Sequence, residues 1–276
     1  MSQGNGNGNG NGSNGSKPAS VSALFNSARE EGTLSPAAVK ALTIPDLGAR
    51  IAAGLGIKVD DVAASEVTLV TMMPDDSGSI RFGGNAQAVR DGHNLVLEAL
   101  GRSRQREGIL AHTRYLNGFV LYPYCPLDGA VRMDSHNYDP NQGTPLYDQT
   151  VVLLGTVLAK AQEFAHSGVP AHTVTLLITD GADEHSTHST AKDVRAIAQD
   201  MLRSEMHIVA AMGIDDGRTD FRKVFRDMGI EDRWILTPGA SQSDVRRAFQ
   251  VFSQSAVQAS QGAARFSRTA VGGFAN

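Results

Sequence analysis

The chain of 276 residues contains a single cysteine and no long apolar run. Cys125 cannot form an internal disulfide, and without a second cysteine there is no CxxC pair to hold a soft metal. No apolar stretch reaches the roughly 18 residues of a membrane-spanning helix, and the first residues lack the basic start and apolar core of a secretory signal. These absences predict a cytoplasmic protein with no membrane partner. Any metal it binds should be held by oxygen.

Clustered positive charge is also missing. The formal net charge is -4, and the basic residues are scattered apart from a short run at 102–106. A nucleic-acid-binding protein needs a basic patch on one face, so no nucleic-acid partner is expected. The 41% hydrophobic and 20% charged residues are the proportions of an ordinary globular domain.

Composition divides the chain into four segments. Residues 1–17 are rich in Gly and Asn, cannot bury enough apolar area to fold, and are expected to be a disordered tail. Residues 18–65 are expected to be a helical extension with helices at 20–31, 36–42 and 45–55, the second opened by the favourable pair Ser35-Pro36. Residues 66–260 form the main domain, and 261–276 are expected to be a flexible tail.

Within the main domain, apolar strands alternate with amphipathic helices. Strands are predicted at 66–73, 112–115, 119–124, 173–179, 206–212 and 234–237, and helices at 86–100, 146–166, 191–203, 221–228 and 243–260. This alternation predicts an α/β fold, a doubly wound and mainly parallel central sheet with helices on both faces. The turn signal Asn117-Gly118 joins two strands as a hairpin and adds one antiparallel edge strand. Ligands of such sheets bind beyond the carboxyl ends of the strands.

Three polar loops are expected at that edge. Asp75, Ser77 and Ser79 alternate in the segment DDSGS, directly after the strand 66–73. Thr144 precedes the helix 146–166, and Asp180 follows the strand 173–179. Two carboxylates and three hydroxyls form a hard oxygen set, which suits Mg²⁺ (or Mn²⁺/Ca²⁺) and not a Zn²⁺ held by His and Cys. Because the set carries few protein charges, the bound ion stays strongly electrophilic, and an incoming carboxylate can take an open position.

Each loop alone has an ordinary structural explanation. An Asp-x-Ser-x-Ser segment is usually a turn, Thr144 before Pro145 could be a helix N-cap, and Asp180-Gly181 is a common turn. The metal site is favoured because all three loops fall on one edge of one sheet. Four further polar residues are expected to be solvated loop residues rather than ligands of a second ion: Asp183, Glu184, His185 and His188.

Enzyme motifs are incomplete. A haloacid dehalogenase-like phosphatase needs Asp-x-Asp after its first strand, whereas position 77 is serine. The Gly-x-Ser-x-Gly elbow of serine hydrolases and the phosphate-binding loop of nucleotide hydrolases are both absent. The sequence therefore predicts no enzyme, no catalytic residues and no organic cofactor.

Together, DDSGS after a strand, GTPLYD before a long helix and LLITDGADEHS after another strand resemble the von Willebrand factor A (vWA) domain of the intracellular prokaryotic type. The resemblance covers about residues 66–260 and implies a Rossmann-like fold with a complete metal-ion-dependent adhesion site (MIDAS). It implies that Ser77, Ser79 and one further oxygen bind the metal directly and that the remaining groups act through water. The metal set is then Asp75, Ser77, Ser79, Thr144 and Asp180.

The resemblance also implies a function. It points to a metal-dependent protein-binding module that captures a Glu or Asp carboxylate of a protein partner through the MIDAS-bound cation. Similar prokaryotic domains work beside AAA+ ATPases, so such an ATPase is one expected partner. The alternative is a structural subunit of a larger intracellular assembly, in which residues 18–65 and the tail are assembly elements and the metal only stabilises the loops.

Overall fold

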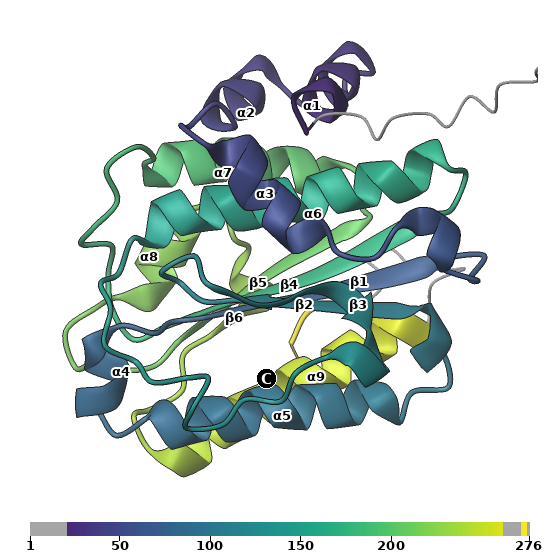
Figure 1. The fold of residues 1–276 in the computed structure, drawn as a ribbon. Helices are drawn as coiled ribbons and strands as arrows, with labels where there is room; N and C mark the ends of the chain where they lie inside the picture. Colours follow the sequence, from purple (N-terminus) through teal and green to yellow (C-terminus); the bar gives the residue numbers. More distant parts are fainter. Residues whose placement is uncertain (1–20, 262–271, 275–276) are drawn as a thin grey trace, which may run out of the picture.

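One six-stranded sheet forms the centre of the protein (Figure 1). The computed structural model describes residues 21–261 and 272–274, so the predicted tail 1–17 and most of the predicted tail 261–276 lie outside the described residues. The strand order is β3-β2-β1-β4-β5-β6, and every neighbouring pair is parallel except β2 and β3. The strands are β1 (Val67–Pro74), β2 (Ile109–Arg114), β3 (Val120–Pro126), β4 (Ala171–Thr179), β5 (His207–Gly213) and β6 (Ile235–Leu236). The predicted fold class, with its antiparallel edge strand, is confirmed.

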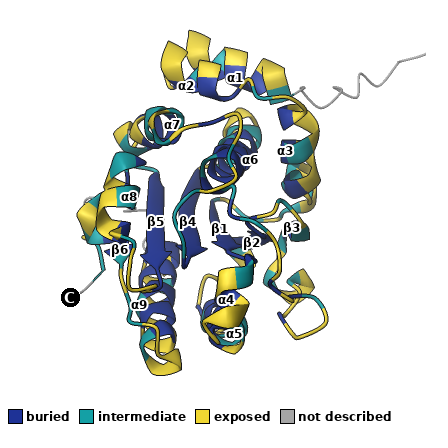
Figure 2. Ribbon diagram, turned by 90° about the vertical axis from the view of Figure 1, so that its left-hand side faces the viewer, coloured by how far each residue is buried: buried dark blue, intermediate teal, exposed yellow. Residues whose placement is uncertain are grey.

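The two central strands bring distant polar loops together. β1 and β4 are buried at every position, as strands covered by helices on both faces must be (Figure 2). Their register pairs Met73 with Leu177 and Pro74 with Ile178, so both strands end at the same level. The residues that follow them, Asp75 and the segment from Asp180, therefore leave the sheet side by side.

Helices cover both faces of the sheet (Figure 1). On one face lie α5 (Ala86–Gly101) and α9 (Gln242–Gln261), and on the other lie α6 (Leu146–His166) and α7 (Ala191–Arg203). α8 (Phe221–Asp227) packs beside β5, and the short α4 (Gly78–Phe82) projects from the carboxyl edge of the sheet. Single 3₁₀ turns are at Val59–Asp61, Arg106–Gly108, Leu127–Gly129 and Asp232–Trp234. No helix among the described residues has the length and apolar character needed to cross a bilayer.

The helical extension forms a third layer over α6 and α7 (Figures 1 and 2). It consists of α1 (Val21–Glu30), α2 (Pro36–Ala41) and α3 (Leu47–Leu55). α2 packs on α7, and α3 packs on α6. Ser35 caps α2 as predicted, since its hydroxyl accepts the Ala38 N–H, and its own N–H donates to the buried Asp200 carboxylate at 2.5 Å. The extension is thus part of the folded core.

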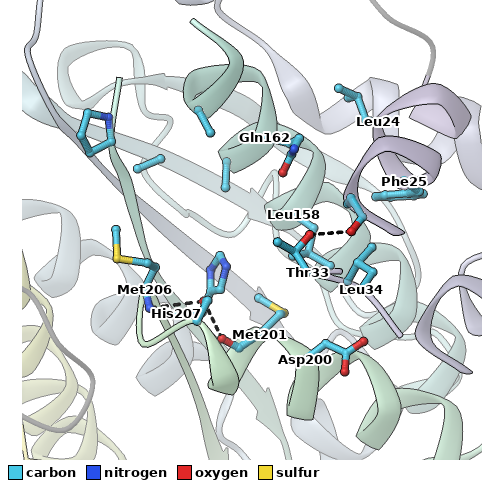
Figure 3. A pocket seen from close by; sticks show the side chains of 16 residues that line it. Leu24, Phe25, Thr33, Leu34, Leu158, Gln162, Asp200, Met201, Met206 and His207 are labelled. Carbon is cyan, nitrogen blue, oxygen red and sulfur yellow. Dashed lines mark hydrogen bonds between the residues drawn. The ribbon is translucent and has the colours of Figure 1, made fainter. Parts of the chain in front are cut away.

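A cavity of about 240 Å³ remains beneath this extension (Figure 3). Leu24 and Phe25 of α1 line one side, and Met206 and His207 at the amino end of β5 line the other. Burial lowers the pKa of His207 to about 4, so its ring is neutral, and its Nδ1 is 2.8 Å from the Thr173 hydroxyl. The cavity lies at the amino ends of β4 and β5, the edge opposite the predicted metal loops.

Candidate metal centre

A second cavity, of about 460 Å³, opens at the carboxyl edge of the sheet. Ser77, Ser79, Thr144 and Asp180 all border it, so four of the five predicted metal ligands share one space. The rest of the lining consists of Gly78, Gln142, Gly143, Gly181, Ala182, Glu184, His185, Asp216, Arg218 and Thr219. The three predicted loops therefore meet at one point.

A chain of oxygen atoms connects two of these loops. The Ser77 and Ser79 hydroxyl oxygens lie 2.8 Å apart, and the Ser79 hydroxyl donates to Asp180 Oδ1 at 2.6 Å. Neighbouring oxygens in an octahedral shell of radius about 2.0–2.1 Å are about 2.9 Å apart. The described residues contain no cluster of three or more His, Cys, Asp or Glu that could hold a metal. A divalent ion here would depend on hydroxyl oxygens, as the predicted set does.

Asp75 lies beneath the cavity. Its side chain is fully buried, Oδ1 accepts the Ser77 N–H at 2.7 Å, and Oδ2 accepts the Thr179 hydroxyl at 2.6 Å. The Tyr138 hydroxyl donates to the backbone carbonyl of Asp75. Both carboxylate oxygens therefore hold the loop in place. Direct contact between Asp75 and a metal stays a prediction.

Asp76 faces away from the metal cavity. Its Oδ1 accepts the Asn117 N–H at 3.0 Å, and it borders a neighbouring cavity of about 200 Å³ with Tyr115 and Phe119. Burial raises the pKa of Asp76 to about 7, against the lowering effect of the Asn117 hydrogen bond, and the charge of Asp75 raises it further. Asp76 thus ties the loop to the β2–β3 hairpin, and its raised pKa leaves the carboxyl partly protonated near neutral pH.

The two carboxylates at the centre resist ionisation without a cation. Burial raises the pKa of Asp180 to about 6, and the Ser79 hydrogen bond only partly opposes this. Burial likewise raises the pKa of Asp75, although Ser77 and Thr179 donate to it. A cation bound nearby would favour the charged form of both groups. The chemistry of the donor set therefore fits a divalent ion.

Thr144 is held from the loop that follows β4. His185 Nδ1 accepts the Thr144 N–H at 2.9 Å, while the N–H groups of Glu184 and His185 point to the Thr144 carbonyl at 3.1 and 3.3 Å. α6 begins at Leu146 with Pro145 in the N-cap position and no side-chain cap. The alternative explanation of Thr144 as a helix cap therefore does not apply, and its side chain borders the cavity instead.

The residue that anchors this loop was not expected from the sequence. Asp148, in the first turn of α6, accepts the backbone N–H groups of Thr187, His188 and Ser189 at 2.9, 3.2 and 2.6 Å. Burial alone would raise the pKa of Asp148, but these amides hold it below its ordinary value. The acidic residue in GTPLYD was the available signal, because an Asp in a first helical turn often binds free backbone amides.

Of the four residues expected to be solvated, two have structural roles. Asp183 accepts the Tyr147 N–H at 3.1 Å, and His185 accepts the Thr144 N–H as described. Glu184 and His188 have exposed side chains, and Glu184 borders the cavity. The 183–189 loop is therefore attached to the start of α6 and carries one wall of the site.

Solved structures resemble this chain in fold, whereas no sequence match was found. No protein-family profile matches the chain, and no curated protein matches its sequence. Among solved structures, the pilus adhesin SpaC from Lactobacillus rhamnosus GG in its open conformation is similar, with a TM-score of 0.52 and 16% identity over 71% of this chain. The matched part is 30% of the SpaC chain, so this chain corresponds to less than a third of that protein.

Two other structures overlap less closely, both with TM-scores of 0.46. One is the SpRpn10 VWA domain, with 9% identity over 66% of this chain and 93% of that one. The other is proximal thread matrix protein 1 from the mussel byssus with a zinc-occupied MIDAS motif, with 14% identity over 69% of this chain and 46% of that one. Both of these TM-scores are below 0.5, so the comparison rests on SpaC, and at 16% identity that likeness extends no further than the fold.

Proposed function

We propose that this chain is a metal-dependent protein-binding module. Ser77, Ser79, Thr144 and Asp180 would hold a divalent cation, with Asp75 supporting the first loop from below. When bound, the ion supplies an electrophilic centre with a position open to an oxygen ligand, which suits a Glu or Asp carboxylate of a protein partner. The observation that carries the proposal is the convergence of these four side chains on one cavity.

The hydrogen bonds around the cavity favour binding over catalysis. The Ser77 and Ser79 hydroxyls pair with each other and the Ser79 hydroxyl donates to Asp180, while no histidine in the described part of the chain hydrogen-bonds to either hydroxyl. The imidazole that borders the cavity, His185, uses Nδ1 to accept the Thr144 N–H. These side chains hold an ion-binding geometry and do not form a nucleophile–base pair.

The packing of the extension supports the same choice. α1, α2 and α3 lie against α6 and α7 of their own chain, so these surfaces are used within the molecule. This arrangement favours the binding module over an assembly subunit that uses the extension to join other subunits. The vWA resemblance adds a cytoplasmic setting and an AAA+ ATPase as one candidate partner.

The first test is metal titration. Calorimetric titration with MgCl₂ and MnCl₂ should show one site in the natural chain and a loss of at least about tenfold in affinity in Ser79→Ala and Asp180→Asn. Asp215→Asn is the matched control, because Asp215 is exposed and does not border the cavity. Equal metal affinity in all four proteins would overturn the proposal.

The second test concerns the carboxylate. A random-peptide display library is bound to the chain in Mg²⁺ and eluted with EDTA. The eluted peptides should contain Asp or Glu at a fixed position, and Asp180→Asn should select none of them. Peptides without an acidic residue, or retention through EDTA, would contradict capture through the metal.

A further inference from the structure

An exposed aromatic ring lies beside the metal cavity. Among the described residues, the large hydrophobic side chains that are exposed are Phe82 at 89%, Phe119 at 57% and Val131 at 42%. Phe82 is the last residue of α4, and Ser79, one of the predicted ligands, precedes it by three positions, about one helical turn. The most exposed of these side chains therefore stands next to the proposed binding centre.

The ring is directed toward the edge of the opening. A β-carbon placed on Gly78 would lie 3.4 Å from Phe82 Cε2 and 3.9 Å from Cδ2, so the ring covers the Gly78 backbone. Gly78 stands between Ser77 and Ser79 and borders the cavity with them. The ring therefore packs against a residue that borders the opening.

The helix that carries the ring is fixed on its other side. Ile80 is fully buried in the core, and the Gly78 N–H donates to the Gln142 carbonyl at 3.1 Å. Arg81 forms an ion pair with Asp139. Ile80 points inward, and Phe82, two positions later in the helix, lies on the opposite side. Because the contacts above hold α4 in this orientation, Phe82 is exposed.

An exposed ring in this position can be buried against a bound protein partner. Burial of a Phe side chain removes a large apolar area from water, and aromatic side chains near the centre of an interface often dominate its affinity. Phe82 contributes little to the core of its own chain at 89% exposure. A carboxylate seated in the cavity would bring the adjacent side chains of its segment over this ring.

We propose that Phe82 determines specificity by selecting partners whose acidic residue has an apolar side chain one or two positions away. Successive residues of an extended segment advance about 3.3 Å each, so these neighbours remain within reach of the ring when the acid is in the cavity. The inference rests on the proposed function, since the metal positions the acidic residue. The partner is thus a protein segment with a paired acidic and apolar motif.

The display selection described above tests this specificity in the natural chain, Phe82→Ser, Phe82→Leu and Phe119→Ser. Phe119→Ser is the matched control, because Phe119 is also an exposed Phe but borders the neighbouring cavity. The natural chain and the control should select an acid with Leu, Ile, Met, Phe or Trp within two positions. Phe82→Leu should keep this preference, and Phe82→Ser should select the acid without it.

A selected peptide then gives the size of the effect by fluorescence polarisation. Phe82→Ser should weaken its binding by about tenfold, and Phe82→Leu by less. Mg²⁺ affinity should stay the same in both, because the ring supplies no ligand. An unchanged apolar preference in Phe82→Ser would overturn this inference and leave the metal proposal standing. Selection without any acidic, EDTA-eluted peptide would overturn both.

Discussion

The hydroxyl of Thr179 donates to Oδ2 of Asp75 at 2.6 Å. Thr179 ends β4, Asp75 follows β1, and the two residues are separated by 104 positions. The bond joins the first and third metal loops below the cavity, at a point where both side chains are fully buried. The geometry of the candidate site therefore depends on a contact that lies below the residues bordering the cavity.

Replacing the Thr179 hydroxyl should lower both the stability of the fold and the metal affinity of the site. Thr179→Val keeps the shape of the side chain but leaves a buried carboxylate oxygen without its hydroxyl partner. The free energy of unfolding should fall by about 1–3 kcal/mol, measured by urea denaturation, and Mg²⁺ affinity should fall with it. Thr175→Val is the control on the same strand, because the buried Thr175 hydroxyl has no hydrogen-bond partner among the described residues. It should be neutral or stabilising, and equal losses in both variants would refute the assigned role.

Relative to Asp76→Asn, the metal-free natural chain should lose stability as pH rises from 6.5 to 8. The pKa values of Asp76 and Asp180 are raised from 3.8 to about 7 and about 6, so these groups hold more protons when folded. Their contribution is complete below pH 3.8 and is lost as pH rises through 6 to 7. Buried His93, His112 and His207 have lowered pKa values and add stability as pH rises through 6.5, but they do so equally in both proteins.

Denaturation curves across this range give the measurement. Between pH 6.5 and 8 the natural chain should lose on the order of 1 kcal/mol relative to Asp76→Asn, since the neutral amide does not titrate. Saturating Mg²⁺ should stabilise both proteins more at pH 8 than at pH 6.5, because the ion favours ionised Asp180. A stability difference between the two proteins that does not change with pH would show that Asp76 does not titrate in this range.

The 183–189 loop should loosen when its anchor is removed. Asp148→Ala leaves the N–H groups of Thr187, His188 and Ser189 without their acceptor, and stability should fall by about 2–4 kcal/mol. Amide hydrogen exchange should accelerate at these three positions, and Mg²⁺ affinity should drop because the same loop holds Thr144. Asp193→Ala is the comparison, since Asp193 caps the next helix and does not reach α6. Slow exchange retained in Asp148→Ala would contradict the anchoring role.

The contact between α5 and α9 should tolerate no added carbon at Gly92. A β-carbon there would lie 2.0 Å from Phe249 Cδ2, far inside van der Waals contact. Gly92→Ala should therefore lower the melting temperature by several degrees, a shift that about 1–3 kcal/mol produces in a domain of this size. Gly101→Ala, in the same helix with open space around it, should leave it unchanged or slightly raised. If Gly92→Ala left the melting temperature unchanged, α5 and α9 would be packed less tightly at this contact than the 2.0 Å distance implies.

The sequence predicted the fold well because its main signals are local. The apolar run at 66–73 and the long helix at 146–166 were found within a few residues of β1 and α6. β2 was the least accurate strand: it was expected at 112–115 and lies at Ile109–Arg114. α4 was missed, since five residues with two glycines beside them give too short a helical pattern to detect.

The site was predictable only in part. Motif spacing gave five residues, and the structure brings Ser77, Ser79, Thr144 and Asp180 to one cavity. The sequence alone could not show that Asp75 lies below the cavity, because that position depends on the pairing of β1 with β4. Nor could it find the contact between His185 and Thr144, which joins positions 41 residues apart through a loop without regular structure.

The position of α1 has a practical consequence for presenting the protein on a surface. Leu24 and Phe25 share a cavity with residues at the amino ends of β4 and β5, while the oxygen-rich opening follows the carboxyl ends. β4 has nine residues, which places about 30 Å between the two edges. A bead, dye or sensor chip coupled to an exposed residue of α1 therefore attaches behind the molecule, and the immobilised protein leaves its opening facing the solution.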